Sequence, residues 1–261
     1  MKIIKIDQQA FYSLRYINAG KRGGIVKEIL PFLKAYSPTL PDDVDAVLIS
    51  SDLQGVVASE AGYQLLGIAV AQRYIELARQ GQVPDPKRTG VILAGDLYAA
   101  SDGAQRGASG DVTSVWQAFA SFAWVAGVQG NHDRFVHLDW FASAPNIHLL
   151  DHDVLSLSGC QIAGVGGVIG DEQVAGYRCE ADFFAALSLV LEEKPEVLIL
   201  HQGARGHDHQ RGNPDIQQYL LEYQQPLTIC GHVHWEQPLA QLSDDVQVLN
   251  VDRRVVVLQR M

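Results

Sequence analysis

Val91-Ile92-Leu93-Ala94-Gly95-Asp96 places a glycine and a carboxylate directly after a short apolar run. The run lacks the polar alternation of a strand with one wet face, so it predicts a β-strand buried on both faces. Four other runs share this character and are also expected to form strands: residues 47–50, 124–128, 197–200 and 227–230. Helical patterns separate them, which predicts an α/β fold with crossover connections.

Three helices are expected between these strands. Ser59 can cap a helix over residues 59–80, which ends at a glycine. A shorter helix is predicted over residues 111–122 and a third over residues 182–194.

A second, partly antiparallel sheet is expected beside the first. Apolar residues flank Ser158-Gly159, which indicates a hairpin within residues 147–170. Residues 246–251 and 255–258 also read as strands, and a second sheet would accommodate all of them.

The N-terminal part gives a weaker pattern. Residues 24–36 could form a helix interrupted by Pro31, and residues 37–43 read as a linker. The sequence contains no repeat and no low-complexity linker. We therefore expect one domain over residues 1–261, in which residues 1–45 are an extension of unclear role.

The composition indicates a globular protein with a sizeable core. Of the 261 residues, 47% are hydrophobic and 19% are charged, and the formal net charge is −10. This charge argues against a nucleic-acid-binding protein with a basic surface, although it permits a small nucleotide held by metal ions. The three cysteines form no Cys-x-x-Cys pair, which argues against a disulfide framework and a thiolate zinc site.

The first residues alternate in polarity and carry charges, unlike the apolar centre of a signal peptide. No apolar run approaches the roughly 20 residues that span a bilayer. The expected location is therefore the cytoplasm.

Ligand-type side chains follow the predicted strands. Ligands bind beyond the carboxyl ends of strands in open α/β sheets, and this position is occupied by Asp52, Asp96, Asn131, His201 and His232. His234 lies two residues further along and needs only a bend to reach the same space. Each residue alone has common structural roles, but separate strand ends have no shared structural reason to carry such residues. Their conjunction predicts a hydrolytic site with two metal ions.

In this order the motifs resemble those of the calcineurin-like metallophosphoesterases. The matching motifs are Ser51-Asp52-Leu53-Gln54, Gly95-Asp96, Gly130-Asn131-His132-Asp133, His201 and Gly231-His232-Val233-His234. The resemblance covers about residues 47–251. It implies a four-layer α/β/β/α sandwich, in which helices flank two central mixed sheets, and a metallophosphoesterase activity.

The resemblance also implies two groups of metal ligands. The first ion would be held by Asp52, Gln54, Asp96 and His234, and the second by Asp96, Asn131, His201 and His232. Such mixed oxygen and imidazole ligands suit Mn, Fe or Zn. A hydroxide bridging the two ions would attack the phosphorus of a phosphomonoester or phosphodiester.

Two further residues of the third motif receive catalytic roles from the resemblance. His132 would contact the phosphate and protonate the leaving oxygen. Asp133 would orient or charge the His132 imidazole.

Gln54 stands where the family has a histidine. An amide oxygen is neutral and a weaker ligand than imidazole, so the first ion is expected to bind loosely or to be a harder cation such as Mn or Mg. One alternative is a non-catalytic binding module on the same fold. Another is a metallohydrolase that cleaves a pyrophosphate or an acyl ester.

The expected partner is a small phosphorylated substrate rather than a membrane or a nucleic-acid polymer. Loops over residues 99–111 and 203–215 would surround the site, and Arg106 in the first of them could contact the substrate. Lys21-Arg22-Gly23-Gly24 could cradle an anion, but a basic glycine turn is more often only a turn. The oligomeric state stays open.

Overall fold

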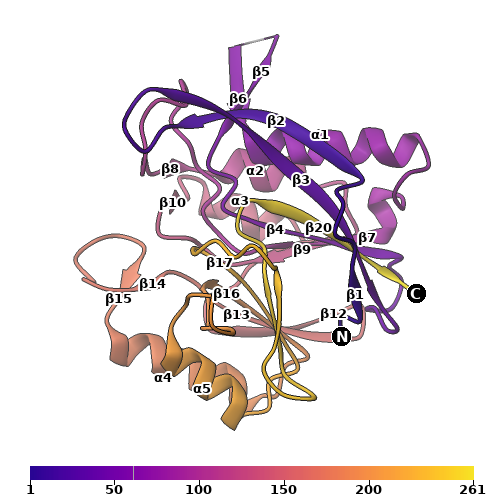
Figure 1. Ribbon diagram of the computed structural model, residues 1–261, viewed down its shortest axis with the longest axis vertical. Coiled ribbons are helices and arrows are strands. Elements are labelled where there is room, and N and C mark those ends of the chain that lie inside the picture. The colour runs from indigo at the N-terminus through magenta and orange to yellow at the C-terminus, as the bar shows by residue number, and fades with distance from the viewer. Residues whose placement is uncertain (61) are drawn as a thin grey trace.

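The computed structural model describes residues 1–60 and 62–261 and has a mixed α/β fold with several mixed sheets (Figure 1). The strands are β1 (Lys5–Ile6), β2 (Tyr12–Ala19), β3 (Ile25–Ser37), β4 (Ala46–Ser51), β5 (Val56–Ser59), β6 (Gly62–Leu65), β7 (Thr89–Leu93), β8 (Gly110–Asp111), β9 (Trp124–Gly127), β10 (Asp133–Arg134), β11 (Ile147–Leu149), β12 (Asp153–Leu157), β13 (Cys160–Val165), β14 (Val168–Ile169), β15 (Tyr177–Arg178), β16 (Val197–Gln202), β17 (Leu227–Gly231), β18 (Leu239–Gln241), β19 (Gln247–Asn250) and β20 (Arg254–Arg260). The helices are α1 (Leu66–Arg79), α2 (Thr113–Ala118), α3 (Leu138–Ser143), α4 (Glu180–Glu192) and α5 (Pro214–Glu222), with a 3-10 turn at Pro86–Arg88.

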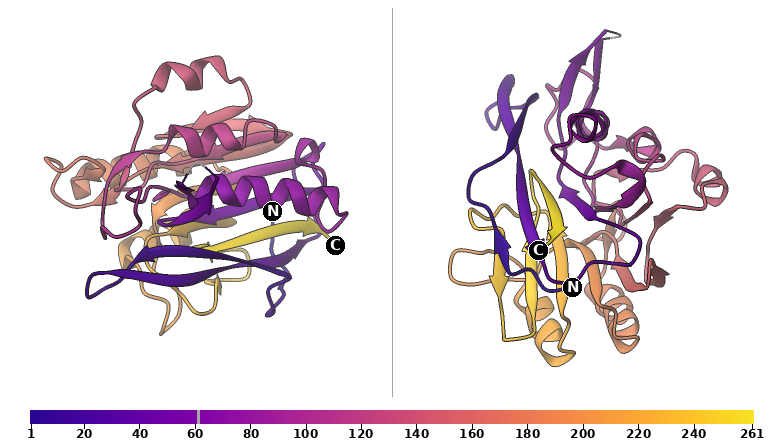
Figure 2. Two further views of the ribbon diagram at one scale, coloured as in Figure 1. Left: turned by 90° about the horizontal axis from the view of Figure 1, so that it is seen from above. Right: turned by 90° about the vertical axis from the view of Figure 1, so that its right-hand side faces the viewer.

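The largest sheet has ten strands in the order β11-β9-β7-β4-β20-β3-β2-β5-β6, and β1 pairs with β3. Strands β4, β7, β9 and β11 run parallel, whereas β20 is antiparallel to β4 and parallel to β3. The N-terminus and the C-terminus lie close to each other in all three views, because their strands share this sheet (Figures 1 and 2).

The second sheet has six strands in the order β12-β13-β16-β17-β19-β18. The four central strands are parallel, and the two outer strands are antiparallel to their neighbours. The predicted hairpin at Ser158-Gly159 is confirmed, since it joins β12 to β13. Two small sheets pair β8 with β10 and β14 with β15.

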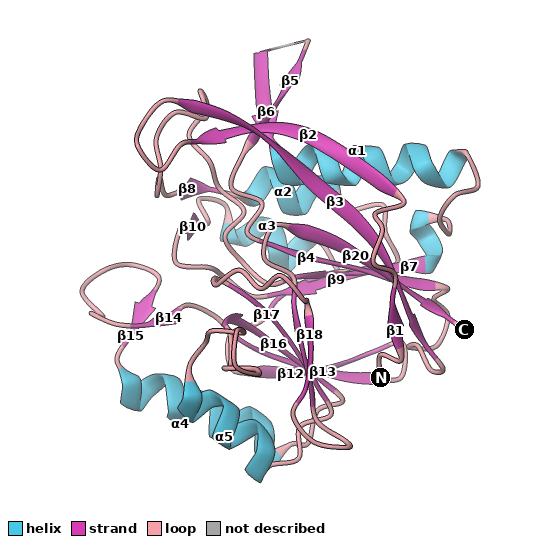
Figure 3. Ribbon diagram, in the orientation of Figure 1, coloured by secondary structure: helices cyan, strands magenta, loops and turns pink. Residues whose placement is uncertain are grey.

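Helices lie beside both large sheets (Figure 3). One buried cluster joins α1 and α2 to the ten-stranded sheet through Tyr74, Trp116 and Leu48, and another joins α4 and α5 to the six-stranded sheet. A third cluster contains side chains of both sheets, including Ile49 of β4 and Ile199 of β16. Neighbouring residues of β4 thus belong to different clusters, as the alternation of side chains along a strand requires.

The five strands predicted from apolar runs are confirmed, but the first helix begins later than expected. Residues 56–59 and 62–65 form the β5–β6 hairpin, so Ser59 is a strand residue and caps no helix; residue 61 lies outside the described residues. The helix starts at Leu66 and ends at Arg79, close to the predicted end. The other two helices are shorter than, or shifted from, the predicted ranges.

The prediction of a helix over residues 24–36 is wrong, because these residues form the long strand β3. Strand β2 pairs with it antiparallel from Ile25 to Phe32, and β20 pairs with it parallel from Phe32 onwards. Pro31 is tolerated because the ladder with β20 begins only at the following residue. Pairing with a strand more than 200 residues away therefore overrides the local pattern.

The C-terminal strands divide between the sheets. β19 joins the second sheet as predicted, whereas β20 is inserted between β3 and β4 of the first.

In the described part of the chain, no helix has the length and apolar character needed to cross a membrane.

Candidate metal centre

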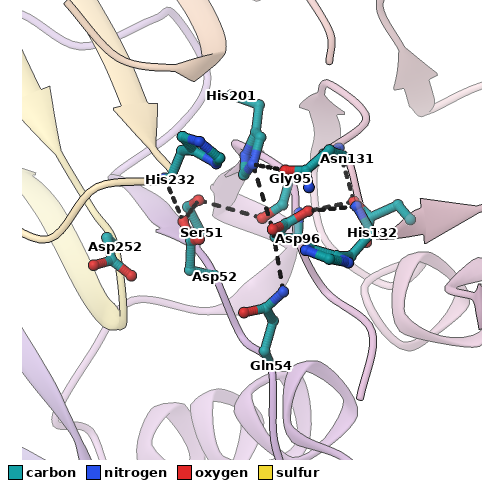
Figure 4. Close-up of polar contacts among 12 residues, drawn as sticks. Ser51, Asp52, Gln54, Gly95, Asp96, Asn131, His132, His201, His232 and Asp252 are labelled. Atoms are coloured by element: carbon teal, nitrogen blue, oxygen red, sulfur yellow. Dashed lines mark hydrogen bonds and ion pairs between the residues drawn. The ribbon is translucent and has the colours of Figure 1, made fainter. Parts of the chain in front are cut away.

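Side chains that follow strands of both large sheets meet in one place (Figure 4). Asp52 follows β4, Asp96 follows β7, and Asn131 comes shortly after β9. His201 lies near the end of β16, and His232 directly follows β17. The structure thus brings together the five predicted strand-end residues.

Three of these residues have a backbone conformation that L-residues rarely adopt. The φ angle is 53° at Asp52, 56° at Asp96 and 67° at His232. Such left-handed conformations turn the chain sharply at the strand end, and they concentrate at functional sites. The turn directs each side chain back toward the shared space.

Two glycines allow the strand ends to approach this closely. A Cβ atom at Gly130 would lie 2.2 Å from the backbone nitrogen of Asp96, and one at Gly231 would lie 1.9 Å from Ser51 Oγ. Any larger residue would therefore force the loops apart. This explains why glycine precedes Asn131 and His232 in the two motifs.

Asp96 lies at the centre of the contacts. Its Oδ1 accepts the backbone N–H of His132 at 2.9 Å, and its Oδ2 accepts a hydrogen bond from Gln54 Nε2 at 3.1 Å. The same Oδ2 lies 3.4 Å from His201 Nε2. The side chain is buried, and although burial raises its pKa, the adjacent His201 and the hydrogen bonds lower the pKa below its usual value.

The His201 ring directs Nε2 toward two oxygen atoms. Its Nδ1 lies 2.8 Å from the carbonyl oxygen of Ala94, which can only accept, so Nδ1 carries the ring proton. Nε2 then faces Asp96 Oδ2 and, at 3.2 Å, Asn131 Oδ1. The Asn131 amide nitrogen points elsewhere, 3.4 Å from the Tyr177 hydroxyl.

Three electron-pair donors that face one another require a cation between them. Burial lowers the pKa of His201, but the Asp96 carboxylate outweighs this and raises the pKa above its usual value, so a proton can serve as that cation. A divalent metal ion satisfies the same donors, and the mixed oxygen and imidazole set fits such an ion. The donor atoms of Asp96, His201 and His232 lie within 4.8 Å of one another and form a candidate metal-binding cluster.

His232 is suited to coordination by its charge state. Burial and then the nearby His201 lower the pKa of His232 to about 4, so the ring is neutral at pH 7 and has a lone pair to share. Its ring centroid lies 5.1 Å from that of His201.

Asp52 is also buried, and it is held by one backbone and one side-chain hydrogen bond. Its Oδ2 accepts the N–H of His232 at 2.9 Å and a short hydrogen bond from Ser51 Oγ. Burial and then the charge of Asp252 raise the pKa of Asp52 to about 8. A bound cation would reverse this effect, because it favours the ionised carboxylate.

The predicted ligands of the first ion are less well gathered than those of the second. Gln54 directs its amide nitrogen, not its oxygen, toward Asp96. His234 has a side chain that is 43% exposed, and its Nδ1 lies 3.0 Å from Asp252 Oδ2. Among residues 1–60 and 62–261, Asp52 and His234 are not part of a compact group of three metal-type ligands. Their role as ligands stays a prediction.

Asp252 was not predicted from the sequence. It follows β19 by two residues and is 5% exposed. Its carboxylate lies against His234 Nδ1. A histidine that binds a metal through one ring nitrogen commonly donates the other N–H to a carboxylate in this way. The signal was available, since Asp252 is another carboxylate just beyond a strand.

His132 and Asp133 differ from their expected arrangement. Asp133 is fully buried, and its carboxylate accepts the backbone N–H groups of Asp96, Leu97 and Gly130 at 2.7–2.9 Å. The His132 imidazole instead contacts Ser109 Oγ through Nδ1, at 3.2 Å. Asp133 thus ties together the loops that carry Asp96 and Asn131. Its expected effect on the His132 ring stays a prediction.

Comparison with known proteins supports one family. The family described as calcineurin-like phosphoesterase matches residues 46–236. Among solved structures, TT1561 of Thermus thermophilus is similar at 18% identity, covering 80% of this chain and 90% of that chain with a TM-score of 0.55. A second crystal structure is similar at 14% identity, with coverages of 82% and 91% and a TM-score of 0.54. Among curated proteins there is no match.

The two solved structures establish a shared fold, and the family match establishes to which family the chain belongs. The matched segment is more than half of the chain and contains every strand-end residue from Asp52 to His234. The chain therefore belongs to the calcineurin-like phosphoesterase family.

Proposed function

We propose that the protein is a phosphoesterase that hydrolyses a phosphomonoester or phosphodiester of a small molecule, using two divalent metal ions. Family membership supports a metal-dependent phosphoesterase in general. The observation that carries the proposal is the convergence of lone pairs from Asp96, Asn131 and His201, which suits a cation. We also propose that residues 1–261 form a single domain with the four-layer α/β/β/α arrangement of two sheets and flanking helices.

Each predicted ligand has a place in this proposal. The second ion would be held by Asp96, Asn131, His201 and His232, and the first by Asp52, Gln54, Asp96 and His234. Two ions bound there would supply an activated water as the nucleophile and would neutralise charge on the phosphoryl oxygens; Mn, Fe and Zn all suit the donors. Asp252 would fix the His234 ring by holding Nδ1.

His132 is the proposed general acid. It is half-buried at the edge of the centre, and its Nδ1 is engaged by Ser109 Oγ. Nε2 is then available to donate a proton to the leaving oxygen. Asp133 contributes by fixing the loops on either side rather than by contact with the ring.

We expect His132→Asn to lower kcat by about 10²- to 10⁴-fold without loss of metal, because a positioned acid contributes this much. The loss should be larger for phenyl phosphate than for 4-nitrophenyl phosphate, since the poorer leaving group needs the proton more. Turnover of both esters and of their diester counterparts is measured with added Mn.

The matched control for this measurement is His152→Asn. His152 is exposed in the turn before β12, and asparagine tolerates its left-handed conformation. His152→Asn should behave as the unmodified protein. An equal loss for both leaving groups would rule out His132 as the acid, and no turnover of any ester with metal bound would overturn the proposed reaction.

The alternative of a non-catalytic binding module rests on Gln54. We expect Gln54→His to tighten binding of the first ion by at least about tenfold, because an imidazole replaces an amide that now donates to Asp96. Metal content after dialysis is compared with that of Gln80→His, an exposed glutamine at the end of α1. If neither the unmodified protein nor Gln54→His ever holds a second ion, the two-metal proposal fails.

A further inference from the structure

A cavity of about 530 Å³ opens beside the candidate metal centre. Asp52, Gln54 and His232 line its inner side, and its outer side is formed by the end of the β2–β3 hairpin and by residues 105–108. A volume of this size accommodates a small organic molecule rather than a phosphate group alone. A substrate bound here would therefore extend from the centre toward the hairpin.

The hairpin that forms the outer wall lies outside the segment matched by the family. Its turn is closed by hydrogen bonds from Gly20 N to Gly24 O at 2.9 Å and from Gly23 N to Gly20 O at 3.0 Å. Strand β3 pairs with β20 within the sheet, and β2 pairs with β5 at Ile17. Figures 1 and 2 show the hairpin reaching past the body of the sheet. The wall is thus an anchored part of this chain.

Three cations line this outer wall: Lys21, Lys27 and Arg106. All three are exposed, and within the described residues none lies within 4.0 Å of a carboxylate oxygen. Unpaired cations at one opening contrast with a formal net charge of −10 for the whole chain. They raise the local potential for an anion that enters the cavity.

Glu28 is a carboxylate that lines the same cavity, and it already has other partners. Glu28 accepts hydrogen bonds from the Tyr16 hydroxyl at 2.7 Å and from Asn18 Nδ2 at 3.2 Å. Its other oxygen lies 3.6 Å from Arg253. Glu28 is therefore held on the hairpin by other partners, and the cations remain available to a ligand.

We propose that Lys21, Lys27 and Arg106 bind a second anionic group of the substrate. The substrate class is then a phosphoester whose leaving group carries a further phosphate or carboxylate. This rests on the proposed function, because the scissile phosphate is assigned to the metal centre. Lysine and arginine bind such groups by charge-assisted hydrogen bonds. The cavity lies between these cations and the metal centre, so the body of the substrate would occupy it.

The test compares two inert ligands by calorimetry on the Mn-loaded protein. Propylphosphonate carries one anionic group, and alkane-bisphosphonates of three to eight carbons carry one at each end; neither contains an ester bond. We expect at least one bisphosphonate to bind about tenfold or more tightly than propylphosphonate. The Lys21→Ala/Lys27→Ala/Arg106→Ala variant should reduce this preference to about the twofold statistical advantage of two identical ends. Metal content is measured after each titration to detect removal of ions.

Two matched variants separate charge from structure. Lys21→Arg/Lys27→Arg should keep the preference, and Arg15→Ala should keep it too, because Arg15 is exposed on the same hairpin but does not line the cavity. Equal affinities for the two ligand types, or a preference that survives in Lys21→Ala/Lys27→Ala/Arg106→Ala, would overturn the inference. Turnover of phosphoesters is assayed separately, so that failure of the proposed reaction is recognised independently.

Discussion

Asp96→Asn is expected to lower kcat/KM for phosphoesters by at least about 10³-fold and to reduce metal content at the same time. Asp96 is the carboxylate assigned to both ions, and it lies against His201, His132 and Gln54. Asparagine keeps an oxygen for the backbone of His132 but loses the charge. The fold should therefore persist while the centre loses its ions. Metal analysis and turnover on the same sample measure both effects.

The control for this prediction is Asp153→Asn. Asp153 is an exposed carboxylate at the start of β12, away from the centre. It should retain full metal content and activity. If Asp96→Asn were to keep both ions and normal turnover, the assignment of Asp96 as a shared ligand would be wrong.

The largest effect on stability is expected for Asp133→Ala. The buried carboxylate accepts three backbone N–H groups, and its removal leaves those donors without partners. Each unsatisfied buried donor costs about 1–3 kcal/mol, so we expect a loss of about 3 kcal/mol or more in the free energy of unfolding. Urea unfolding of the metal-loaded protein measures this loss.

Asp139→Ala, at an exposed position in the first turn of α3, is the control and should change stability by about 0.5 kcal/mol or less. Asp133→Asn discriminates between the two roles considered for this residue. A structural role predicts lower stability, with turnover per folded molecule largely retained. Unchanged stability with a shifted pH profile of kcat would instead favour the hypothesis that Asp133 charges the His132 ring.

The strands that carry the site could be predicted because their signal is local. Strands β4, β7, β9, β16 and β17 are buried on both faces, so each one is a continuous apolar run in the sequence. The ligand-type residues at their ends could be predicted for the same reason. Within each sheet, parallel pairing places the carboxyl ends at the same edge. The packing of the two sheets against each other, through residues such as Ile49 and Ile199, then brings the two edges together.

The elements that were missed depend on distant partners. Strand β3 reads as a broken helix, and only its pairing with β2 and β20 makes it a strand. The β5–β6 hairpin is likewise held by β2 at Ile17. No local pattern in residues 24–36 or 59–65 could reveal these partners.

The site residues that were missed or reassigned have a similar cause. Asp252 joins the centre because β19 pairs with β17, and this places its strand end beside Asp52 and His234. Asp133 was assigned to its neighbour His132, but the close approach of Gly130 to Asp96 brings three N–H groups to its carboxylate instead. The sequence shows which chemical groups are present near the strand ends, but the conformation of the loops determines which of these groups are in contact.

The most direct test of the metal centre is anomalous diffraction at the manganese edge from a crystal soaked with Mn and phosphate. We predict a strong anomalous peak bounded by Asp96, Asn131, His201 and His232, and a weaker one toward Asp52 and Gln54. An absence of anomalous density between Asp96 and His201, with Asp96 still hydrogen-bonded to a protonated imidazole at saturating Mn, would contradict the account.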